Sequence, residues 1–199
     1  MTTSIFDIPA LEELPNAIEA KAAAERLLDE RKVTVPDFPA PGVRYLDFYR
    51  SYERYPAIRE AVTECFRQRY GGGAVDAVAG IGGGGFGLGS CLALLLKVPF
   101  HPIRKASETT YNVFSVSTGT SYSKRELTLA MDIVEHGSRV VLVDDTIATG
   151  GTTKGAIDLL HRAGAIVVEV ATVFELISCA GRKRIYPTPL FSVISRDEF

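Results

Sequence analysis

Two adjacent carboxylates, Asp144 and Asp145, are the residues whose types and spacing point most clearly to chemistry. They follow residues 140–143, an apolar run that is typical of a strand buried on both faces of a sheet. Because ligands of open α/β sheets bind at the carboxyl ends of the strands, we expect both acids to face a ligand. The alternative is that they are surface acids before an ordinary turn between a strand and a helix.

A turn rich in glycine and threonine follows the acids and opens a predicted helix. Glycine lets backbone N–H groups approach a phosphate closely, and a helix N-terminus supplies partial positive charge. The segment lacks the Gly-x-x-x-x-Gly-Lys pattern of a P-loop, since Lys154 stands three positions after the second glycine. The predicted phosphate-binding residues are Ala148, Thr149, Gly150, Gly151 and Thr152.

The segment from Val140 to Gly155 resembles the phosphoribosyl pyrophosphate signature of type I phosphoribosyltransferases. Both contain an apolar strand, paired acids and a Thr-Gly-Gly-Thr turn. The resemblance implies that Asp144 and Asp145 bind the 2- and 3-hydroxyls of the ribose, and that residues 148–152 hold the 5-phosphate. It also implies Mg²⁺ as a cofactor that arrives with the substrate and has no direct protein ligand.

Further stretches, within about Val35 to Ile194, resemble adenine phosphoribosyltransferases. In that family an aromatic residue of the N-terminal signature stacks on the base. The resemblance therefore implies that Tyr45 stacks on a purine, whose edge the backbones of Arg44 and Leu46 read; alternatively, Tyr45 is a core aromatic. The similar stretches are Pro36 to Asp47, Ile103-Arg104-Lys105, Glu175-Leu176 and Gly181-Arg182-Lys183.

The expected pyrophosphate loop departs from the family pattern. Gly82, Gly83 and Gly84 replace an acid, a serine and an arginine, and Gly85 precedes Phe86. The backbone of such a loop can still wrap an anion, although the guanidinium is absent. Two further departures lie downstream, where Glu108 replaces a lysine and Ser121 a glutamate.

Arg104 and Lys105 could offset the negative charge of the donor in place of the missing cations. We therefore group them with Asp144 and Asp145 as catalytic candidates.

These features predict a purine phosphoribosyltransferase, a glycosyltransferase that converts adenine and phosphoribosyl pyrophosphate to AMP and pyrophosphate in purine salvage. Two alternatives stay open. One is a catalytically weakened paralogue that binds nucleotide or donor as a regulatory or scaffolding subunit, and the other is a transferase for a different purine. The expected partners are small-molecule substrates and a second copy of the chain, or a paralogue.

The elements that must position these residues alternate between strand and helix. Strands are expected over 74–81, 100–104, 140–143 and 166–176, and helices over 16–32, from 56, 86–98 and 152–163. The pattern predicts an α/β fold similar to type I phosphoribosyltransferases, with a mostly parallel, twisted sheet and helices on both faces. Residues 1–34 are expected to form a helical extension or hood, 35–199 the transferase domain, and 106–125 an extended arm or mobile loop.

Composition excludes several other classes. A net charge of −2 and a pI near 6.0 provide no broad attraction to nucleic acid. The longest apolar run, around residues 91–96, is too short to span a membrane, and the N-terminus lacks the pattern of a secretory signal. Three widely spaced cysteines read as reduced structural thiols. We therefore expect a cytoplasmic protein without a membrane partner.

Overall fold

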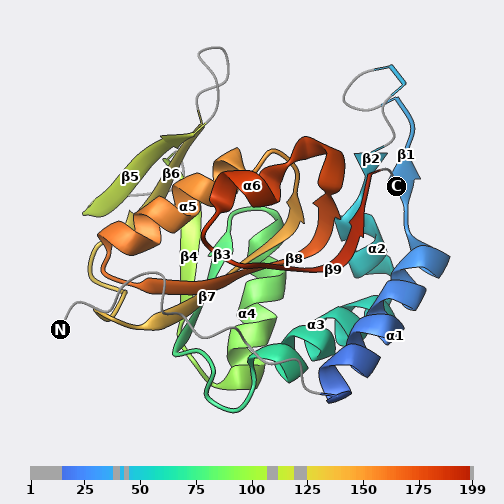
Figure 1. Cartoon of the computed structure of the whole chain (residues 1–199), viewed down its shortest axis with the longest axis horizontal. Coiled ribbons are helices and arrows are strands. Elements are labelled where there is room, and N and C mark those ends of the chain that lie inside the picture. Colours follow the sequence, from blue (N-terminus) through green and yellow to red (C-terminus); the bar gives the residue numbers. More distant parts are fainter. Residues whose placement is uncertain (1–14, 38–40, 43–44, 107–111, 119–124, 198–199) are drawn as a thin grey trace.

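A seven-stranded sheet organises the part of the chain that the computed structural model describes, which is residues 15–37, 41–42, 45–106, 112–118 and 125–197. The strand order is β5-β6-β4-β3-β7-β8-β9 (Figure 1). The five parallel strands are β3 (Ala77–Ile81), β4 (Phe100–Lys105), β7 (Arg139–Ile147), β8 (Ile166–Leu176) and β9 (Leu190–Arg196). The predicted, mostly parallel α/β sheet is confirmed.

Two antiparallel strands extend one edge of this sheet. They are β5 (Val113–Thr118) and β6 (Arg125–Ala130), and β6 pairs with β4. The arm predicted over residues 106–125 is therefore extended where the structure describes it. Residues 107–111 and 119–124, which include Glu108 and Ser121, lie outside the described residues.

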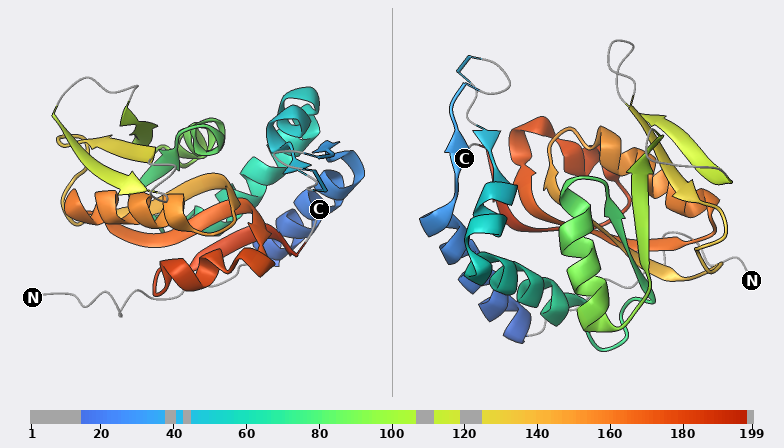
Figure 2. Two further views of the ribbon diagram at one scale, coloured as in Figure 1. Left: turned by 90° about the horizontal axis from the view of Figure 1, so that it is seen from above. Right: turned by 180° about the vertical axis from the view of Figure 1, so that it is seen from behind.

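Helices cover both faces of the sheet, as Figure 2 shows from above and behind. Side chains alternate along β7, so that Val141 and Val143 face one core cluster while Val140 and Leu142 face the other. The first cluster lies under α1 (Pro15–Arg31), α2 (Phe48–Arg54), α3 (Pro56–Tyr70) and α4 (Gly84–Leu96). The second lies under α5 (Gly151–Arg162) and α6 (Gly181–Ile185), which follows a short 3₁₀ turn, Ile177–Cys179.

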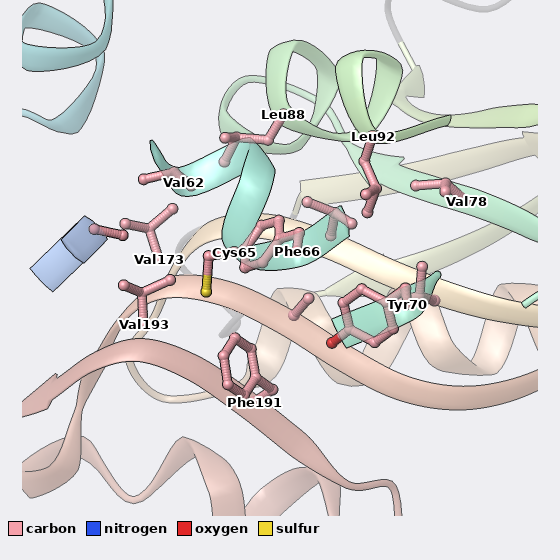
Figure 3. Close-up of a cluster of buried hydrophobic side chains, with 14 of the residues drawn as sticks. Val62, Cys65, Phe66, Tyr70, Val78, Leu88, Leu92, Val173, Phe191 and Val193 are labelled. Carbon is pink, nitrogen blue, oxygen red and sulfur yellow. The ribbon is translucent and has the colours of Figure 1, made fainter. Parts of the chain in front are cut away.

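Aromatic side chains from α3 and β9 fill the centre of the first cluster (Figure 3). Phe66 packs edge-on against Phe191 with ring centroids 6.2 Å apart, and Tyr70 is fully enclosed. The Tyr70 hydroxyl donates to Glu169 at 2.6 Å, and Arg69 donates to the same carboxylate at 2.6 and 2.8 Å. The buried Glu169 carboxylate thus has hydrogen-bond partners, as buried polar groups in native proteins generally do.

The predicted amphipathic N-terminal helix is confirmed as α1. It buries Ala24 and Leu28 against the first cluster, and its Asp29 forms an ion pair with Arg196 of β9 at 2.7 Å. The division of the chain at residue 34 stays a prediction. A short ribbon, β1 (Thr34–Val35) paired with β2 (Tyr45–Leu46), follows α1.

No helix in the described residues is both long and apolar enough to cross a membrane. Of the three free cysteines, Cys65 is buried, Cys91 is half-buried and Cys179 is exposed, so only Cys65 lies in the core.

Candidate active site

The paired acids lie within β7. We predicted that this strand ends at Val143, but it continues to Ile147 because β8 is long enough to pair with it up to Glu175. The Asp145 N–H donates to the Asp144 carboxylate at 3.0 Å. Both side chains are therefore held on a rigid strand.

The environment of the two acids disfavours negative charge. Burial raises the pKa of Asp144 well above its ordinary value of 3.8, and the neighbouring charge of Asp145 raises it further. Burial also raises the pKa of Asp145, with an added contribution from Asp47. Two adjacent carboxylates with raised pKa values, one buried and one half-buried, are typical of a functional site, where a ligand with hydroxyl donors or positive charge can compensate them.

The predicted phosphate loop, residues 148–152, connects β7 to α5 as a strand–turn–helix unit. Gly150 has a left-handed backbone, with φ of +72°, and forms the N-cap of α5. It has no side chain to satisfy the free N–H groups of the first helical turn, so these groups can bind an anion. Thr149 is exposed and Thr152 half-buried beside them. Whether this loop binds an anion stays a prediction.

The stretch Gly181-Arg182-Lys183 packs directly against the phosphate loop through Gly181. A side chain on Gly181 would collide with the Ala148 carbonyl, and one on Gly150 would lie 2.8 Å from the Gly181 carbonyl. Arg182, the next residue, donates to Glu175 at 2.9 and 2.6 Å. Burial would raise the pKa of Glu175, yet these bonds and one from Ser195 hold it below its ordinary value. Gly181 therefore restricts the conformation of the phosphate loop, although it lies outside the segment from Val140 to Gly155.

Sequence reasoning missed Arg184. This residue lies on α6, and its Nη1 is 3.5 Å from the point that a Cβ on Gly151 would occupy. A cation therefore lies beside the N-terminus of α5. The sequence contained no signal for it, because the distance between α5 and α6 depends on how Gly150 and Gly181 pack.

The four glycines lie next to the acids. Gly82 and Gly83 form a turn after β3, and Gly84 and Gly85 already belong to α4, which we expected to begin at Phe86. Asp145 occupies the space above Gly84, where any Cβ would be 2.8 Å from the Cβ of Asp145 and closer still to its carboxylate. Because β3 and β7 are parallel neighbours, this glycine loop, residues 82–85, lies at the same sheet edge as the acids.

Arg104 and Lys105 end β4 beside the glycine loop. Gly82 donates its N–H to the Ile103 carbonyl at 2.8 Å, and both basic side chains are exposed. The structure thus brings the two cations to the same edge of the sheet as the loop. Whether they act on a substrate stays a prediction.

The base-binding prediction is only partly within the described residues. Tyr45 and Leu46 form β2, while Arg44 and the side chains of Tyr45 and Leu46 lie outside the described part. Helix α2 follows β2 and was not predicted. It carries Tyr49, whose hydroxyl donates to the Gly83 carbonyl at 3.1 Å and also reaches the Gly84 carbonyl.

Curated proteins match most of the chain. Residues 47–199 match the phosphoribosyl transferase domain family. The chain is 38% identical to the adenine phosphoribosyltransferase of Roseiflexus sp. (strain RS-1) over 160 residues, which cover 80% of this chain and 92% of the relative. It is also 38% identical to that of Bradyrhizobium sp. (strain ORS 278) over 166 residues, 82% of this chain and 92% of the relative.

Solved structures give the same result. The adenine phosphoribosyltransferase of Rhodothermus marinus DSM 4252 has a TM-score of 0.79 and 34% identity, with 87% of this chain and 99% of the other covered. The enzyme from Saccharomyces cerevisiae, complexed with an imino-altritol bisphosphate and adenine, has a TM-score of 0.79, 28% identity and the same coverage. This chain, with its type I phosphoribosyltransferase fold, therefore belongs to the adenine phosphoribosyltransferase family.

Proposed function

We propose that this protein transfers the phosphoribosyl group of phosphoribosyl pyrophosphate to adenine, which yields AMP and pyrophosphate for purine salvage. One observation carries the proposal: two paired acids on β7, buried Asp144 and half-buried Asp145, are followed by a glycine turn that opens the N-terminus of α5. In this proposal Asp144 and Asp145 accept hydrogen bonds from the ribose hydroxyls. The N–H groups of residues 148–152 bind the 5-phosphate.

Arg184 adds a charge to the same phosphate subsite. Its guanidinium lies beside Gly151, and a guanidinium forms strong, directional bonds with phosphate oxygens. Because AMP and the donor share the 5-phosphate, Arg184 should strengthen the binding of both.

The reaction breaks the bond between C1 of the ribose and the pyrophosphate oxygen. The bonding electrons leave with the pyrophosphate, a ring nitrogen of adenine supplies the pair for the new bond to C1, and the proton that the imidazole ring of adenine loses passes to water. Positive charge develops on the ribose after the bond to pyrophosphate has begun to break and before the bond to adenine is complete. In this proposal the carboxylates of Asp144 and Asp145 stabilise that charge, while the loops orient the reactants.

The leaving pyrophosphate would lie on the glycine loop. Arg104 and Lys105, at the neighbouring end of β4, would supply positive charge in place of a side chain from the loop. The base would stack on Tyr45, with the backbones of Arg44 and Leu46 reading its edge.

The donor set fits Mg²⁺ that arrives with the substrate. The described residues contain no group of three or more side chains that could hold a metal ion. Because Asp144 and Asp145 would accept the ribose hydroxyls, the ion would be held by substrate phosphates and water, with no direct protein ligand. When bound, the ion would neutralise charge on the departing pyrophosphate.

Two alternatives to adenine transfer are separated by one assay. Adenine, hypoxanthine and guanine are each offered with saturating donor and Mg²⁺, and nucleotide formation is followed. We expect turnover within the ordinary enzyme range, about 1 to 10³ per second, with adenine alone. Turnover with another base instead would identify a different transferase. Inertness toward all three bases, with tight binding of AMP, would support a regulatory paralogue, which the relatives do not favour.

We also propose that the protein acts in the cytoplasm as a homodimer. Leu94 and Leu95 of α4 are exposed by 77% and 48%, which is unusual for leucine at the end of a core helix. Light scattering on the purified protein, compared with a Leu94→Lys variant, tests the dimer.

A further inference from the structure

The hydroxyl of Tyr49 joins α2 to the start of α4. It donates to the Gly83 carbonyl at 3.1 Å and reaches the Gly84 carbonyl. A side chain on Gly87 would lie 3.2 Å from this hydroxyl. One phenol thus contacts two backbone carbonyls at the first turn of α4.

The phenol is itself held firmly. Its ring packs edge-on against Phe48 with centroids 5.7 Å apart and lies 5.8 Å from the ring of Tyr52. Helix α2 is fixed at its N-terminus, where Asp47 accepts the Arg50 N–H at 3.1 Å. The hydroxyl is therefore delivered to the glycine loop by a rigid element.

The hydroxyl also keeps its proton. Burial and the nearby charges of Asp145 and Asp144 raise the pKa of Tyr49 to about 12. The neutral phenol can donate to carbonyl oxygens throughout the physiological range.

The glycine loop needs such support more than an ordinary loop does. Glycine has more backbone freedom than any other residue, so residues 82–85 lose more conformational entropy on ordering than a loop of other residues. None of them has a side chain that could bond to its surroundings. If a loop becomes ordered only when the ligand binds, the free-energy cost of ordering it lowers the affinity for that ligand.

We propose that Tyr49 is a positioning residue that pre-orders the glycine loop for pyrophosphate. The inference rests on the proposed function, in which this loop holds the leaving group. Tyr49 stands three positions after Leu46 in the chain, so the same short segment connects the proposed base subsite to the pyrophosphate subsite.

The variant Tyr49→Phe tests this, since it removes the hydroxyl and keeps the ring contacts. The matched control is Tyr52→Phe on the same helix, whose hydroxyl faces the Cys91 sulfur at 3.7 Å and not the loop. Three measurements are made on each protein: amide hydrogen exchange over residues 82–88 without ligand, and calorimetric affinity for Mg²⁺-pyrophosphate and for AMP.

We expect Tyr49→Phe to accelerate exchange over residues 82–88 and to weaken pyrophosphate binding about fivefold, the effect of one ordinary hydrogen bond. AMP affinity should change less than the pyrophosphate affinity, and Tyr52→Phe should leave all three quantities as in the natural sequence. Unchanged exchange in Tyr49→Phe would overturn the inference, as would an equal loss of AMP and pyrophosphate affinity.

Failure of the proposed function would look different. A protein that made no nucleotide from any base and bound no pyrophosphate would contradict that function. The exchange rates over residues 82–88 would still decide whether the Tyr49 hydroxyl orders the loop.

Discussion

The Asp145 carboxylate lies directly over Gly84, in the space that any side chain at residue 84 would need. Asp145 belongs to the paired acids and Gly84 to the glycine loop, and the position of each depends on the other. A cation restored at residue 84 would have to displace Asp145. The present position of Asp145 is therefore possible only because glycine replaces the family's arginine at residue 84. Restoring the arginine alone would not restore the family's arrangement.

The variant Gly84→Ala should weaken AMP binding about tenfold, because its methyl group pushes Asp145 away from the ribose and removes roughly one hydrogen bond to a charged group. A double-mutant cycle with Asp145→Gly isolates the cause, because glycine also removes the Asp145 Cβ that a Cβ at residue 84 would meet at 2.8 Å. Once the carboxylate is gone, the methyl group at residue 84 should have little further effect. Calorimetry that gave additive losses would show that Gly84 acts independently of Asp145.

The variant Asp144→Asn should stabilise the ligand-free protein at neutral pH while it weakens nucleotide binding. The folded-state pKa of Asp144 is raised, so the native state binds more protons than the unfolded state above pH 3.8. Stability from this group therefore falls as pH rises from about 4 to the raised pKa and is constant above it. Asparagine cannot ionise and avoids that loss, and its carbonyl can still accept the Asp145 N–H.

Urea unfolding of both proteins from pH 4.5 to 8 measures this difference. The advantage of the variant over the natural sequence should grow with pH and then level off. An equal difference at every pH would mean that Asp144 ionises in the folded protein as easily as in water.

The variant Arg184→Gln should weaken AMP and donor binding to the same degree, about three- to tenfold, because the guanidinium is exposed and partly screened. Pyrophosphate binding should not change. Lys183→Gln is the matched control, since it removes the same charge one residue away on α6. Equal effects of the two variants in calorimetry would reduce the role of Arg184 to general electrostatics.

The sequence predicted the elements whose pattern is local. Strand β8 lies where its β-branched run predicted, from Ile166 to Leu176, and the helix after the phosphate loop begins one residue earlier than expected, at Gly151. Both are defined by short stretches of apolar residues and glycines, so one window of sequence contains the information.

Contacts between distant segments could not be predicted in this way. Helix α2, whose sequence is FYRSYER, has three aromatic and four polar or charged residues without a clear apolar period, and its capping by Asp47 was not recognised. The positions of Tyr49 and Arg184 beside glycines of other elements depend on helix packing. Their chemistry is visible only once the sheet has brought α2, α4, α5 and α6 to one edge.

A crystal structure with AMP tests the central claim most directly, because it locates the nucleotide on the protein. We expect the 5-phosphate of AMP to lie within hydrogen-bonding distance, about 2.7 to 3.2 Å, of backbone N–H groups in residues 148–152. We also expect the ribose hydroxyls to donate hydrogen bonds to the carboxylates of Asp144 and Asp145. A phosphate bound elsewhere, such as on the glycine loop at residues 82–85, would contradict the assignment of the site.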